Sequence, residues 1–200
     1  MNRGVHILGM VFLAIGLLIP SNGCGVNNSS SIKKLECHSS NLVHQVIPGT
    51  PNIRLRASRC DDYTFKSKQV AIVLHMFVSE YSRVFGVSEL VLWDYLSGLE
   101  IEVSAIPKVV SSAFDVKGNP VRDVPVSGLA ISPKKIWVEI KTSQIWSSSL
   151  VHELVHTIIW NKNAGIHADP DHEGDQFSGW SSKHTQFIRD LNRTLLDKEI

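Results

Sequence analysis

The chain has 200 residues, a formal net charge of +1 at pH 7 and 43% hydrophobic residues. Balanced charge spread along the chain argues against nucleic acid as a partner, because proteins that bind nucleic acid concentrate Lys and Arg against its phosphates. The length suits one domain of ordinary size with enough apolar side chains to build a core.

The N-terminal segment predicts export. Arg3 precedes an almost wholly apolar run over residues 5–19, which is then broken by proline and polar residues. This is the layout of a secretory signal peptide over residues 1–23, and the run is short for a transmembrane helix. Cys24 resembles the acylated cysteine of a bacterial lipoprotein, although Ser21 stands where such proteins usually carry Leu. We expect a protein anchored by lipid to a membrane of the bacterial cell envelope, or a secreted one if Cys24 is not lipidated.

The remaining cysteines favour the same compartment. With Cys24 assigned to a lipid, Cys37 and Cys60 are left as a pair for one disulfide, with two free buried thiols as the alternative. Residues 24–31 are mostly Gly, Asn and Ser, which suits a flexible tether. The folded domain is expected to span residues 32–200.

The middle of the chain alternates between helical and strand patterns. Apolar residues spaced by three and four predict an amphipathic helix over residues 66–85, in which His75 is interpreted as a core or packing histidine rather than a ligand. A shorter helix is expected over residues 88–96. Strict alternation then predicts a strand over residues 99–106. Its two glutamates, Glu100 and Glu102, share one face and are interpreted as solvated rather than catalytic.

Residues 114–126 read as a turn-rich connector, and further strands are expected over residues 128–131 and 135–140. Helical spacing returns over residues 181–196. His184 lies at the start of this last helix. It is either a residue that supports the site or contacts substrate, or a plain surface histidine.

The most informative feature is the pentapeptide from His152 to His156, which reads His-Glu-x-x-His. Four residues make about one helical turn, so both imidazoles lie on one face and are close enough to bind one Zn²⁺. Glu153 lies about 100° further round, where it can act on a water molecule as a general base. The surrounding apolar residues predict a buried helix, and Ser147, Ser148 and Ser149 offer N-cap oxygens at its start.

A catalytic zinc ion usually takes three protein ligands, so a third must come from elsewhere. The loop after the helix offers His167 and His172 among several acidic residues. We favour His172, because the preceding Asp-Pro-Asp forms a stiff turn and the chain has the length to fold back, and keep His167 as the alternative. Asp171 or Asp175 is expected to orient a ligand imidazole.

The run from His152 through His172 to Trp180 resembles the zincin-like metallopeptidases, in particular small bacterial lipoproteins with this motif, an Asp-Pro loop with His, and a later Trp. The resemblance covers roughly the last third of the chain. It implies an α+β fold, with a small mixed sheet packed on an active-site helix and flanking helices. It also implies that His152 and His156 bind zinc while Glu153 activates water. The chain is not a metzincin, because Ile159 and Lys162 stand where that subgroup needs Gly and His.

In the zincin fold, the last strand before the active helix commonly offers its edge to an extended substrate, and residues 126–131 are nominated here. The expected activity is zinc-dependent hydrolysis of a peptide or protein substrate. One alternative is a non-catalytic zinc-binding surface lipoprotein. Another is an interaction or adhesion lipoprotein in which the pentapeptide is accidental.

Overall fold

The computed structural model describes residues 42–58, 67–104, 108–110, 113–114, 120–140, 144–163 and 179–200. The expected signal peptide, the tether and all three cysteines lie outside these residues. The loop that carries His167 and His172 also lies outside them. Within the described part of the chain, no helix is both long and apolar enough to cross a membrane.

A five-stranded mixed sheet forms one layer of the molecule, with the strand order β1-β2-β3-β9-β8. The inner strands β2, β3 and β9 run parallel, whereas β1 and β8 run antiparallel to their neighbours. The strands are β1 (Leu42–Val46), β2 (Arg54–Ser58), β3 (Glu100–Ser104), β8 (Gly128–Ser132) and β9 (Lys135–Glu139). Strands β3, β8 and β9 confirm the three predicted strands, whereas the alternation pattern had not indicated β1 and β2.

Four α-helices accompany the sheet in the described ranges: α2 (Ser67–Phe85), α3 (Glu89–Leu96), α4 (Leu150–Lys162) and α5 (Ser182–Asp197). A short 3₁₀ helix, η2 (Ile145–Ser147), precedes α4. All four predicted helices are confirmed, and α2, α3 and α5, for which ranges were predicted, agree with them within one residue at each end. The chain is therefore an α+β protein.

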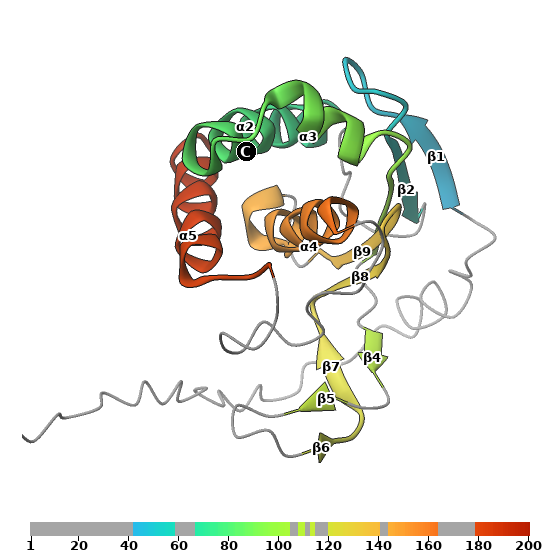
Figure 1. Ribbon diagram of the computed structural model, residues 1–200. Helices are drawn as coiled ribbons and strands as arrows, with labels where there is room; N and C mark the ends of the chain where they lie inside the picture. The colour runs from blue at the N-terminus through green and yellow to red at the C-terminus, as the bar shows by residue number, and fades with distance from the viewer. Residues whose placement is uncertain are drawn as a thin grey trace, which may run out of the picture.

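Helix α4 occupies the centre of the fold (Figure 1). It contacts the helices α3 and α5 and the strands β8 and β9 of the sheet. Leu154, Val155 and Ile158 are at most 1% exposed, which joins this helix to the core. Each such side chain contributes about 1.5–3 kcal/mol by leaving water. The pentapeptide is thus carried by the most enclosed helix among the described elements.

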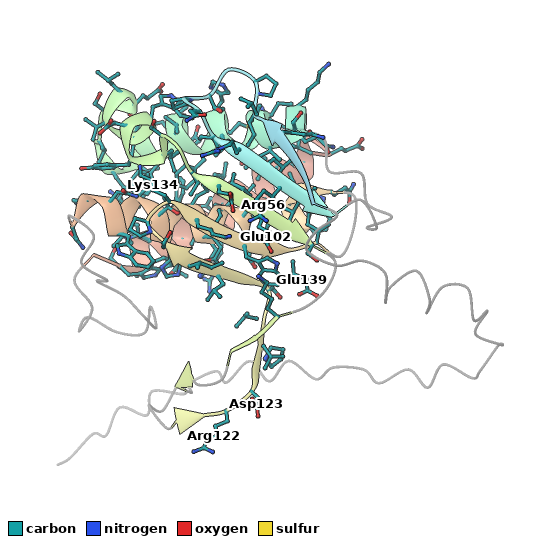
Figure 2. All side chains as sticks on the ribbon, turned by 90° about the vertical axis from the view of Figure 1, so that its right-hand side faces the viewer. Arg56, Glu102, Arg122, Asp123, Lys134 and Glu139 are labelled. Atoms are coloured by element: carbon teal, nitrogen blue, oxygen red, sulfur yellow. The ribbon has the colours of Figure 1, made fainter. Side chains whose placement is uncertain are left out.

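The outer face of the sheet carries an ion-pair network, and Arg56 and Glu102 lie on it (Figure 2). Arg56 Nη1 lies 2.7 Å from Glu100 Oε1, and Lys135 Nζ lies 3.1 Å from the same atom. Lys108 Nζ lies 3.4 Å from Glu102 Oε1. Desolvation raises the pKa of Glu100, but the hydrogen bonds and charges of Arg56 and Lys135 outweigh it and bring the pKa below its usual value. The shared face of the two glutamates is confirmed, and it is ion-paired rather than simply solvated.

Two smaller β-structures lie in the segment between β3 and β8. Strand β4 (Lys108–Val110) pairs with β7 (Val124–Val126), and β5 (Ala113–Phe114) pairs with β6 (Pro120–Val121). The pairs extend away from the main body (Figure 1). The connector predicted over residues 114–126 therefore contains short strands.

His75 is exposed, so its interpretation as a residue of the core is wrong. Its ring still packs edge-to-face against Trp93, at a centroid distance of 5.0 Å. The packing role is confirmed, but at the surface.

Candidate metal centre

Helix α4 begins at Leu150, where the sequence predicted a serine cap. The Ser148 hydroxyl accepts a hydrogen bond from the Leu150 N–H at 3.3 Å. Ser149 occupies the N-cap position, but its side chain makes no capping bond. The side chain that bonds the first turn of the helix therefore belongs to Ser148, one residue before the N-cap position.

The helix brings His152 and His156 together as the spacing predicts. Their Nε2 atoms are 3.2 Å apart, and the two rings are half-buried. Two imidazole nitrogens bound to one tetrahedral Zn²⁺ at 2.0–2.1 Å are separated by about 3.3 Å. The pair therefore fits a shared zinc ion, although the same separation also permits one neutral ring to donate a hydrogen bond to the other.

Glu153 lies on the buried side of α4 and is only 4% exposed. Desolvation raises the pKa of its carboxyl to about 8, and the hydrogen bond donated by the backbone N–H of Ala130 offsets this only in part. A cation held by the neighbouring imidazoles would favour the ionised carboxylate. The residue nominated as general base thus sits in an environment that strengthens its affinity for a proton.

The carboxyl of Glu153 reaches β8 because Gly128 has no side chain. A Cβ added at Gly128 would overlap Glu153 Oε1 and would lie 2.8 Å from its Cδ and 2.7 Å from the Cβ of Ser149. Such distances are far inside ordinary van der Waals contact. Gly128 is therefore required for close packing between α4 and β8, a role that no pattern in the sequence had indicated.

The contact lies at a free edge of the sheet, since β8 pairs only with β9 among the described strands. The Glu139 N–H donates to the Ser127 carbonyl at 2.8 Å, which makes these two residues a hydrogen-bonded pair. Such pairs alternate along an antiparallel ladder, so the backbone groups of Gly128 and Ala130 point away from β9. Glu153 thus meets the outward backbone of the strand nominated for substrate.

Trp180 forms one wall of the site. Its ring centroid lies 5.2 Å from that of His152 and 4.9 Å from that of His156. The side chain is 8% exposed, and its Nε1 donates to Thr185 Oγ1 at 3.2 Å. The sequence had placed Trp180 at the site only through the resemblance to zincin-like proteins.

His184 is buried behind Trp180 and is not a surface histidine. Its Nε2 lies 3.2 Å from the Tyr81 hydroxyl, and its Nδ1 accepts the Ser181 backbone N–H at 3.1 Å. Desolvation, followed by the charges of Lys162 and Lys183, lowers the pKa of His184 to about 4. Burial in turn raises the pKa of the Tyr81 hydroxyl above its usual value. From α5, the ring of His184 packs against Trp180 at a centroid distance of 5.8 Å.

No cluster of three or more His, Cys, Asp or Glu side chains occurs among the residues that the structure describes. His172, His167, Asp171 and Asp175 all lie between residues 164 and 178, outside the described ranges. Two of the three expected zinc ligands are thus brought together. The third stays a prediction.

Comparisons of the chain with protein-family models, with curated proteins and with solved structures find no match. The assignment of a function therefore rests on the geometry of the chain itself.

Proposed function

We propose that the protein is a zincin-like zinc metallopeptidase, exported to the bacterial cell envelope and anchored there through a lipid on Cys24. The observation that carries the proposal is the 3.2 Å separation of the His152 and His156 Nε2 atoms on one face of α4. Glu153 stands directly beside this pair, at the free edge of β8. An ordinary core histidine pair needs neither the carboxylate nor the edge strand.

His152 and His156 would hold the zinc ion together with a third ligand, His172 or His167. When bound, Zn²⁺ acts as a Lewis acid that polarises a carbonyl and lowers the pKa of water. Glu153 takes the proton of the attacking water and then delivers it to the leaving amine. A bound zinc ion would favour the ionised form of the Glu153 carboxyl, which is the form that can accept the proton of water.

An extended peptide fits the free edge of β8. The outward backbone groups of Gly128 and Ala130 would pair with the main chain of such a substrate by β-augmentation. This supports a peptide or protein substrate in preference to a small molecule. The N–H of Ala130 is bonded to Glu153 in the structure, so a substrate that uses this donor must first displace the carboxyl.

The same hydrogen bond favours the second candidate, a zinc-binding lipoprotein without catalysis. A carboxyl that is buried and bonded to the backbone of β8 can serve structure alone. Glu153→Gln separates the two candidates, because it keeps both imidazoles and removes the base.

The test begins with the metal content of chain purified without chelator. We expect close to one zinc per wild-type chain, and less than a tenth of that for His152→Ala and His156→Ala. His75→Ala removes an exposed histidine away from the site and should retain full zinc content. His172→Ala and His167→Ala are compared in the same way, and only one of them should lose zinc. Wild-type chain that stays below a tenth of an equivalent after zinc is supplied removes the basis of the proposal.

Hydrolysis is then tested with a peptide library and an unfolded protein substrate. Wild-type activity should vanish with chelator and return with zinc. Glu153→Gln should keep its zinc and lose at least about 10³-fold in turnover, because the group that moves the proton is gone. A variant that still cleaves at the wild-type rate shows that Glu153 is not the base. Zinc bound at full occupancy without any cleavage favours the non-catalytic candidate.

A further inference from the structure

We infer that Trp180 is a positioning residue for the two metal-binding imidazoles, so that its indole ring sets the zinc affinity of the site. The inference rests on the proposed zinc site. It adds a residue that does not touch the metal. Both imidazoles contact the same indole, with centroid distances of 5.2 and 4.9 Å and interplanar angles of 47° and 36°.

The two rings need such a support. The terminal torsion of a histidine side chain is broad, so neighbouring imidazoles on a helix can rotate away from a common point. Ring centroids 4.5–7 Å apart place the indole in attractive contact with each imidazole. One rigid plane against both rings therefore restricts the two rotations together. A ligand pair that is already oriented loses less conformational entropy when the metal binds.

Trp180 can act as a fixed wall because it is itself held on several sides. Its Nε1 donates to Thr185 Oγ1 at 3.2 Å, which ties the indole to α5. The chain just before it passes close to α4, where a Cβ on Gly179 would lie 2.7 Å from Ile159 Cγ2. Gly179 also has a φ of +126°, a backbone conformation that residues other than glycine rarely adopt.

The start of α5 is fixed in addition by a capping box. The Ser181 side chain bonds the backbone of His184, and the His184 side chain bonds the backbone of Ser181. His184 Nε2 then meets the Tyr81 hydroxyl of α2 at 3.2 Å, and its ring stacks on Phe85 at a centroid distance of 4.3 Å. The indole is thus connected through the start of α5 to α2, and through Gly179 to α4.

The test measures the zinc dissociation constant of the full chain by competition with a chromophoric chelator, for wild type, Trp180→Ala and Trp180→Phe. Trp180→Ala should bind zinc about 10-fold or more weakly, the range seen when a support of metal ligands is removed. Trp180→Phe restores an aromatic plane and should stay within about 3-fold of wild type. Trp93→Ala is the matched control. It removes a tryptophan that packs on His75, and its zinc affinity should equal that of wild type.

Urea unfolding of the metal-free variants separates positioning from a purely structural role. A structural tryptophan would lower the free energy of unfolding and leave the zinc affinity of the folded protein unchanged. Folded Trp180→Ala with wild-type affinity overturns the inference and leaves the proposed function intact. Wild-type chain without zinc affinity overturns both.

If Trp180→Ala does not fold, Thr185→Val tests whether the held indole sets the zinc affinity. It keeps the shape of the side chain and removes the acceptor of the indole N–H. We expect zinc binding to weaken by about 2- to 5-fold with the fold retained, because the indole loses one of its attachments. Unchanged affinity in this variant counts against the inference.

Discussion

Gly128→Ala tests whether Glu153 is packed directly against the edge strand. Gly128 has no positive φ, so alanine is conformationally allowed and should by itself stabilise the strand by about 0.5–1 kcal/mol. The new methyl would lie 2.7 Å from Ser149 Cβ and 2.8 Å from Glu153 Cδ. Ordinary carbon contacts are about 3.5–4.0 Å, so the neighbours must retreat by about 1 Å. Overpacking of this kind costs about 1–3 kcal/mol, which leaves a net loss between about 0 and 2.5 kcal/mol, with a central value near 1 kcal/mol.

The assay is urea unfolding of the metal-free protein at pH 6, run as a mutant cycle. The second background carries Glu153→Ala and Ser149→Gly, which remove the atoms that the new methyl would meet. Glycine is tolerated at an N-cap, so this background should fold. There Gly128→Ala should be neutral or stabilising. Ser127→Ala, an exposed change beside β8, should alter the free energy of unfolding by less than about 0.5 kcal/mol in either background.

An equal cost of Gly128→Ala in both backgrounds would show that the loss of stability does not arise from contact with Glu153 and Ser149. If the protein hydrolyses peptides, Gly128→Ala should also keep its zinc and lose turnover, because the methyl moves the carboxyl and leaves the imidazoles in place.

Three further predictions concern charge. The His184 pKa of about 4 lies below its usual 6.5, so the unfolded chain binds more protons between these values and stability is lost as the pH falls through them. Between pH 7 and pH 4.5, the free energy of unfolding of wild type, measured with urea, should fall by about 2 kcal/mol more than that of His184→Gln. Parallel pH profiles of the two proteins would argue against a buried neutral imidazole. The Glu153 pKa is raised from 4.5 to about 8, so the sign is reversed and stability is lost as the pH rises between these values. From pH 5 to pH 8, the free energy of unfolding of metal-free Glu153→Gln should therefore rise relative to that of wild type by on the order of 3 kcal/mol. Equal pH dependence of stability in the two proteins would contradict this. Arg56→Gln should lower the free energy of unfolding by about 1 kcal/mol at low salt and by less in 1 M NaCl, because its carboxylate partners are partly exposed. A loss of stability that does not change with salt would show that packing rather than charge is lost.

The sequence by itself determined the local elements of this protein. Helices α2 and α5 follow from apolar residues spaced by three and four, and β3 follows from strict alternation over Glu100–Ser104. Helix α4 follows from the apolar residues around the pentapeptide. The meeting of His152 and His156 also follows from sequence alone, because both residues lie on one helix and the helical repeat fixes their separation. Strands β1 and β2 were not predicted, since polar residues interrupt their apolar pattern. Strand β1 pairs with the nearby β2, whereas β2 also pairs with β3, which lies much later in the chain.

Only the tertiary structure decided how the candidate site is enclosed. The contact of Glu153 with Gly128 joins a helix to a strand more than twenty residues earlier, and the contact of Trp180 with the imidazoles joins α4 to the start of α5. Neither contact has a periodic signature, because each depends on the relative placement of whole elements rather than on the repeat within one. For the same reason the sequence did not fix the burial of His75 and His184. His75 lies at the surface, whereas His184 is 8% exposed between α2 and α5. Burial of a single histidine is set by what packs over its helix, and that information is spread over the chain.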